Sequence, residues 1–199
     1  MSEQRVERRL AAILAVDVAG YSRLMGEDEE GTLGALRVVR RELGDPKITE
    51  HRGRIVKTTG DGLLVEFASV VDAVRCAVEV QREMVARNAA VSAGRRIEFR
   101  MGVNVGDIII EDGDIFGDGV NIAARLEALA EPGGICISAA AHEQVRDKLD
   151  FSFEDMGDNR SRTSLGRCGR TALWSVRPLS QSPPPLPQRS SRFRKSRRS

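Results

Sequence analysis

Residues 54–67 read RIVKTTGDGLLVEF, two runs of strand-forming residues on either side of a Gly-Asp-Gly turn. Gly60 and Gly62 give the backbone freedom that a tight turn needs, and the valine, isoleucine, threonine and phenylalanine around them favour extended chain. The segment therefore predicts a β-hairpin with Asp61 at its tip. Because Lys57 lies four residues before that aspartate, one hairpin carries both an ammonium group and a carboxylate.

The segments around the hairpin alternate between strand and helix patterns. Residues 10–16, LAAILAV, form a continuous apolar run that is typical of a buried strand. Apolar residues at helical spacing predict helices over 27–50 and 70–90. The series continues with a strand over 97–110, a helix over 117–130, a strand over 135–138 and a helix over 140–150. This order predicts an α+β fold, a ferredoxin-like βαββαβ sandwich with additional strands and helices.

The composition divides the chain into a body and a tail. With 199 residues, 41% hydrophobic and 30% charged, the chain is long enough for one globular domain and some excess. The net charge is +2, but residues 157–199 contain eleven Lys or Arg and one acid, Asp158, so the remainder carries −8. We expect a domain over 1–157 and a basic, disordered Arg/Ser/Pro-rich tail over 158–199. An acidic body argues against a nucleic-acid partner.

Cysteine usage and hydropathy indicate a compartment. Cys76, Cys136 and Cys168 are widely spaced and form no CxxC motif, so they suggest neither a disulfide framework nor a zinc site. No apolar run approaches the roughly 18 residues of a membrane span, and the first ten residues are too charged for a signal peptide. We therefore expect a cytoplasmic protein with no membrane partner.

Two aspartates are candidates for a metal site. Asp17 ends the first predicted strand and Asp61 lies at the hairpin tip, and a ferredoxin-like sheet can place these strands side by side. Paired carboxylates suit Mg²⁺ or Mn²⁺, which prefer hard oxygen ligands. After Asp17, the small residues of VAGYS, residues 18–22, let backbone N–H groups approach an anion ahead of a helix. The alternative is that each aspartate only caps its own turn.

A polar pair lies on the helix predicted over 117–130. Asn121 and Arg125 are four residues apart and therefore project from one face. An amide and a guanidinium at this spacing can hold a ribose and a phosphate. The alternative is an ordinary solvated helix face.

Four blocks of sequence, in this order, resemble the catalytic domain of the class III nucleotidyl cyclases. They are ILAVDVAGYSRLM, GRIVKTTGDGLLVEF, FRMGVNVGDII and DIFGDGVNIAARLEALAEPGGICIS. The resemblance implies the nucleotidyl cyclase fold and a head-to-tail homodimer with two composite active sites at its interface. It also implies that the chain converts ATP to 3′,5′-cyclic AMP and pyrophosphate.

The resemblance assigns one half of an active site to the metals and the phosphates. It implies that Asp17 and Asp61, with the backbone carbonyl of Val18, bind two Mg²⁺ or Mn²⁺ ions per site. The turn that contains Gly20, Tyr21 and Ser22 would cradle the β- and γ-phosphates, and Arg100 matches an arginine that contacts phosphate.

The other half of each site is implied to come from the partner protomer. Lys57 and Asp114 match the pair that reads the adenine edge, where the guanine-selective relatives have glutamate and cysteine. Asn121 matches the residue that orients the ribose. Arg125 matches the one that stabilises charge on the α-phosphate in the transition state.

The C-terminal part departs from the family pattern. Relatives read like GEQSLKNIARPVRTYR in their closing strands, and no such text is present. With suitable synonymous codons, that text read after a one-base deletion becomes GDNRSRTSLGRCGRT, which is residues 157–171. We therefore expect the last strands of the domain to be missing and the tail from 158 to be out of frame.

Three alternatives to an adenylate cyclase remain open. The first is a catalytically silent, cyclase-like binding or dimerisation module, because the altered C-terminus exposes a sheet edge and removes apolar burial. The second is a guanylate cyclase. The third, a diguanylate cyclase, is suggested only by GEDEEG at 26–31, which has no hairpin around it.

Overall fold

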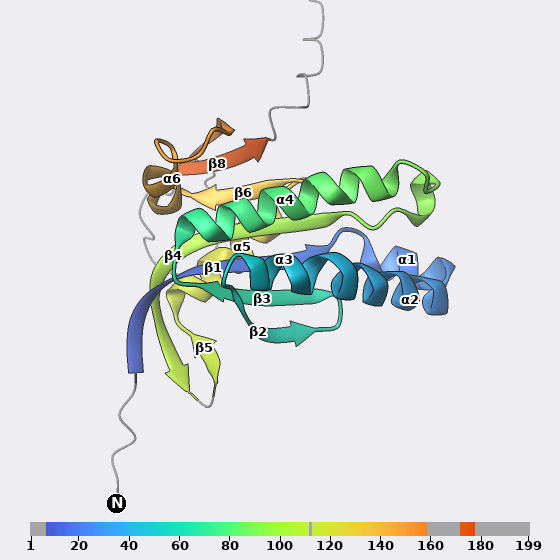
Figure 1. Cartoon of the computed structure of the whole chain (residues 1–199), viewed down its shortest axis with the longest axis horizontal. Helices are drawn as coiled ribbons and strands as arrows, with labels where there is room; N and C mark the ends of the chain where they lie inside the picture. The colour runs from blue at the N-terminus through green and yellow to red at the C-terminus, as the bar shows by residue number, and fades with distance from the viewer. Residues whose placement is uncertain (1–6, 112, 159–171, 178–199) are drawn as a thin grey trace, which may run out of the picture.

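An eight-stranded sheet runs through the computed structural model, which describes residues 7–111, 113–158 and 172–177 (Figure 1). Its strands are β1 (Glu7–Val18), β2 (Arg54–Thr59), β3 (Gly62–Phe67), β4 (Phe99–Glu111), β5 (Asp114–Phe116), β6 (Ile135–Ser138), β7 (Ser152–Asp158) and β8 (Ala172–Arg177). The order is β2-β3-β1-β4-β6-β8-β7, and β5 pairs with β4 off this path. Strand β1 is antiparallel to both β3 and β4. The predicted ferredoxin-like arrangement is therefore confirmed, with additional strands beyond β4.

The helices cover the two faces of the sheet unequally. They are α1 (Tyr21–Glu27), α2 (Glu29–Val39), a π-helical turn (Arg40–Gly44), α3 (Asp45–Glu50), α4 (Val70–Asn88), a 3₁₀ turn (Ala93–Arg95), α5 (Asp118–Leu129) and α6 (Ala139–Val145). In Figure 1, α4 and the row α1 to α3 lie in front of the sheet, and α5 lies behind it. The face behind the sheet is thus only partly covered, by α5.

Alternate residues of β1 build two separate cores. Ala12 and Leu14 pack in the larger core with α4, whereas Ala11, Ile13 and Ala15 pack in a smaller core with Ala123 of α5. A strand that is buried on both faces has no polar side, which explains the continuous apolar run predicted from the sequence. The same alternation points Asp17 toward the α5 face.

The segment expected as one helix over 27–50 is divided. Asp28 ends α1 and begins α2, where its side chain accepts a hydrogen bond from the Gly31 N–H at 2.9 Å. An aspartate at this position satisfies a backbone donor that the helix itself leaves free. The π-helical turn over Arg40–Gly44 then leads into α3.

The structure differs from the sequence prediction at the C-terminal side, where closing strands were expected to be missing and residues from 158 disordered. Residues 172–177 instead form β8, which pairs with both β6 and β7. Val176 is 2% exposed and lies opposite Phe153 of β7. This burial and the ladder on both sides stabilise the strand. Residues 159–171, which carry most of the frame-shift argument, and 178–199 lie outside the described residues.

Candidate active site

The two predicted metal-binding aspartates lie at one end of the sheet. Val16 of β1 is paired with Leu63 of β3, and the two strands are antiparallel. Asp17, one residue after Val16, and Asp61, two residues before Leu63, therefore lie at the same end of the two strands. Gly60, beside Asp61 in the hairpin turn, has a φ of 56°, which glycine adopts without strain. Burial and the adjacent Asp17 carboxylate raise the pKa of Asp61. Two half-buried carboxylates that repel each other form a donor set that fits a divalent cation.

Arg100 lies directly across the β1–β4 ladder from Asp17 and forms an ion pair with it. The hydrogen bond to Asp17 raises the pKa of Arg100. The Arg100 Nε lies 3.4 Å from the Glu127 Oε1. The guanidinium is therefore held between two carboxylates that come from β1 and α5.

Glu127 is a site residue that the sequence prediction missed. Its side chain is 14% exposed, and burial together with Asp17 raises the pKa of Glu127 to about 7. The helix approaches this closely because β4 has Gly102 there, where a Cβ would lie 2.3 Å from the Glu127 backbone nitrogen. One signal was present: Glu127 lies four residues after Ala123 and so shares the face of α5 that packs on the sheet.

The predicted base-reading pair is brought together. The Lys57 Nζ on β2 lies 3.0 Å from the Asp114 Oδ2 on β5. The Lys57 ammonium and the Ile115 N–H, which donates to Asp114 at 2.8 Å, hold the pKa of Asp114 below its usual range. Lys57 is about half exposed, so both side chains remain open to a ligand.

Asn121 and Arg125 are both exposed on α5, away from buried Ala123 and Leu126. Within the described ranges, neither side chain makes a hydrogen bond or an ion pair with the rest of the chain. The structure therefore does not join them to the Asp17 cluster, which is formed by Asp17, Asp61, Arg100 and Glu127.

The predicted phosphate turn connects β1 to α1. Val18 is buried, and Gly20 has a φ of 67° as the residue before α1. The Ala19 N–H already donates to the Glu98 carbonyl at 2.8 Å. The N–H groups of Tyr21 and Ser22 lie in the first helical turn, where they have no partner within the helix.

A second acidic group lies on the opposite face. One ligand atom each from Glu50, His51 and Glu79 fall within 4.8 Å of one another. However, the Lys47 Nζ lies 2.8 Å from a carboxylate oxygen of Glu50 and from one of Glu79. Burial opposes ionisation of Glu79, but Lys47 and His51 lower its pKa. One ammonium is already shared between the two carboxylates of this group, which acts as an ionic link between α3 and α4.

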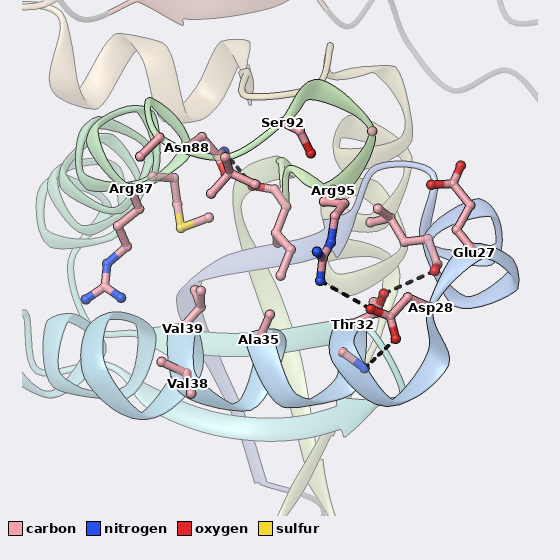
Figure 2. Close-up of a pocket in the computed structure, with 17 residues that line it drawn as sticks. Glu27, Asp28, Thr32, Ala35, Val38, Val39, Arg87, Asn88, Ser92 and Arg95 are labelled. Carbon is pink, nitrogen blue, oxygen red and sulfur yellow. Dashed lines mark hydrogen bonds and ion pairs between the residues drawn. The ribbon is translucent and has the colours of Figure 1, made fainter.

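A cavity of about 760 Å³ lies between α2 and the segment that follows α4 (Figure 2). Its floor includes Val39 and Met84, and the Arg95 Nη2 at its rim lies 3.2 Å from the Asp28 Oδ2. None of the predicted site residues lines it. No helix in the described part of the chain is long and apolar enough to cross a bilayer.

The family model described as the adenylate and guanylate cyclase catalytic domain matches residues 6–174. The chain belongs to the adenylate and guanylate cyclase family. Domains of this family bind nucleotide substrates, generally with divalent metal ions, and commonly dimerise. The cyclase fold predicted from the sequence is thus confirmed.

The similar proteins include cyclases of both nucleotide types. A Rhizobium meliloti (strain 1021) protein, named provisionally as adenylate cyclase 3, is 47% identical over 184 residues, which is 92% of this cyclase chain and 31% of that protein. The chain thus spans about a third of this relative. The crystal structure of an adenylate/guanylate cyclase/hydrolase from Silicibacter pomeroyi has a TM-score of 0.80 at 47% identity, covering 87% of this chain and 99% of that one. The guanylyl cyclase Cya2 has a TM-score of 0.71 at 25% identity, covering 86% and 93%.

Proposed function

We propose that the chain is an adenylate cyclase domain that converts ATP to 3′,5′-cyclic AMP and pyrophosphate. The observation that carries this choice of nucleotide is the contact between Lys57 and Asp114. An ammonium can donate to adenine N1, and a carboxylate can accept from the 6-amino group. Guanine presents a donor at N1 and an acceptor at O6, so the same pair would disfavour it.

The metal and phosphate half of the site is formed by groups on β1, β3 and β4. Asp17, Asp61 and the Val18 carbonyl would hold two divalent cations, and Arg100 would contact the phosphates. The turn over residues 18–22 would add backbone N–H groups. When bound, the cations supply activation of the ribose 3′-hydroxyl and neutralise charge on the departing pyrophosphate.

The second half of the site is Asn121 and Arg125, which we assign, with the Lys57–Asp114 pair, to the partner protomer. Both are exposed and have no side-chain partner among the described residues of their own chain. In a head-to-tail homodimer, Asn121 would orient the ribose and Arg125 would stabilise charge on the α-phosphate. This assignment explains why the two polar groups lie apart from the Asp17 cluster.

The test is an assay of the purified chain with ATP or GTP and Mg²⁺ or Mn²⁺, with cyclic nucleotide as the product measured. We expect cyclic AMP to exceed cyclic GMP, and Asp61→Ala to abolish both. An excess of cyclic GMP would make the protein a guanylate cyclase instead. A folded dimer that forms neither product would be a silent binding or dimerisation module.

A further inference from the structure

The Asp17 cluster contains more negative than positive charge. Asp17, Asp61 and Glu127 face a single cation, the Arg100 guanidinium. The charge of Asp17 acts on Asp61 and Glu127, that of Asp61 acts on Glu127, and that of Glu127 acts on Arg100. Arg100 is therefore the only protein cation, within the described ranges, that these contacts place between the acids.

The proposed function makes two demands on this cluster that compete with the observed ion pair. Asp17 must offer its oxygens to a divalent cation, and Arg100 must offer its N–H groups to phosphate. In the structure, these two groups satisfy each other instead. A carboxylate oxygen that accepts from a guanidinium is less available to a metal, and a bound cation repels the guanidinium, so cation binding competes with Arg100 for Asp17.

The guanidinium contacts its two acids through different nitrogens. An Nη2 nitrogen faces Asp17, whereas the Nε nitrogen faces Glu127. The five N–H groups of arginine form a planar fork, so Nη2 can be released from Asp17 while Nε stays beside Glu127. Glu127 cannot withdraw, because its backbone packs against Gly102 and its side chain is 14% exposed.

We propose that Arg100 exchanges partners when metal binds: its Nη2 leaves Asp17 and turns toward the substrate phosphates, while its Nε stays beside Glu127. Glu127 is then a positioning residue for Arg100 and does not itself touch the substrate. This inference rests on the proposed function, because it takes Asp17 as a metal ligand and Arg100 as a phosphate ligand.

The first test needs no nucleotide and no activity. The chain is labelled with ¹⁵N-arginine and titrated with Mg²⁺, and the Arg100 Nε–H resonance is assigned by its loss in Arg100→Lys. We expect Mg²⁺ to shift this resonance in the wild-type chain, and expect Arg75, exposed on α4, to be unaffected. Arg100 resonances that stay unchanged at saturating Mg²⁺ would overturn the exchange of partners.

The second test uses the sign of a binding change. Affinity for α,β-methylene-ATP with Mg²⁺ is measured by calorimetry for Glu127→Gln, Arg100→Ala and the double variant. Removing a negative charge beside a triphosphate should by itself strengthen binding. A positioning role predicts the reverse, a weakening of about tenfold, because the ion pair that positions Arg100 is lost.

The double variant separates an effect through Arg100 from a direct one. In the Arg100→Ala background, we expect Glu127→Gln to weaken binding by less than about twofold. A loss that persists there, or tighter binding by Glu127→Gln alone, would refute the positioning role. Glu83→Gln, on the opposite face in α4 and exposed, is the matched charge control. Cyclic AMP synthesis by the wild-type chain, measured in parallel, tests the proposed function by itself.

Discussion

Lys57 on β2 and Asp114 on β5 are 57 residues apart in sequence, yet the Nζ of the lysine lies 3.0 Å from the Oδ2 of the aspartate. The contact is possible because β5 folds back on β4, with Glu111 paired to Asp114. The pair therefore presents one donor and one acceptor on the same side of the sheet. A purine base is recognised by such a combination of groups on its Watson–Crick edge.

Changing both members of this pair should change the choice of nucleotide. The double substitution Lys57→Glu with Asp114→Cys is expected to lower kcat/KM for ATP and to raise GTP turnover relative to ATP by about tenfold or more. The single variant Lys57→Glu should turn over both ATP and GTP slowly, because it places two carboxylates together. Initial rates with each nucleotide measure the ratio, and an unchanged ATP preference in a folded double variant would exclude the pair from base reading.

The proposed composite sites predict recovery of activity on mixing inactive chains. Lys57→Ala and Asp61→Ala should each be inactive alone, because each homodimer lacks one group in both sites. Random mixing should restore about a quarter of wild-type activity, since half of the dimers are mixed and each has one intact site. Asp17→Ala mixed with Asp61→Ala damages the same half-site and should recover nothing. Equal recovery in both mixtures would argue against shared sites.

Arg125 should affect the chemical step more than substrate binding. If it stabilises charge that develops on the α-phosphate, Arg125→Ala lowers kcat by about 10²-fold or more and changes KM for ATP little. Steady-state kinetics with ATP give both constants. A change that falls mainly on KM would instead make Arg125 a ground-state binding residue.

The close contact at Gly102 should make this position intolerant of a side chain. A Cβ there would lie 2.2 Å from the Ala123 carbonyl oxygen, so Gly102→Ala should push α5 off the sheet and cost about 1–3 kcal/mol of stability. Gly34→Ala, on α2 with open space around it, should stabilise the chain by about 0.5–1 kcal/mol. Urea unfolding of both variants measures the difference, and equal stabilities would contradict the packing.

Glu127 should make the metal-free chain sensitive to pH. The folded-state pKa of Glu127 is raised from its usual value to about 7, so its contribution to stability is present at low pH and is lost as the pH rises through 7. In EDTA, Glu127→Gln should therefore raise Tm by a few degrees at pH 8.5 and change it little at pH 5. A larger gain in Tm at pH 5 than at pH 8.5 would contradict a raised pKa of Glu127.

The central sheet and the acidic pair were accessible to sequence reasoning because their signals are local. The apolar run over 10–16 and the glycines of the hairpin each fix an element without help from distant residues. Once β1 and β3 were placed side by side, the proximity of Asp17 and Asp61 followed.

The remaining features depend on contacts that no local pattern encodes. Strand β5 is three residues long and exists because β4 offers it a ladder. Strand β8 forms in a segment without clear periodicity because β6 and β7 pair with it on both sides. Glu127 looks like an ordinary helical acid until the approach of α5 to Gly102 is known.

The tight seat of α5 on Gly102 has a genetic consequence. The helix presents Glu127 to the carboxylates of its own chain, while exposed Asn121 and Arg125 are assigned to the site completed by the other chain. Displacing one helix would therefore damage both sites of a dimer. Provided that a Gly102 variant still dimerises, it should inactivate the sites that it shares with the wild-type chain when the two are expressed together. It would then behave as a dominant-negative allele.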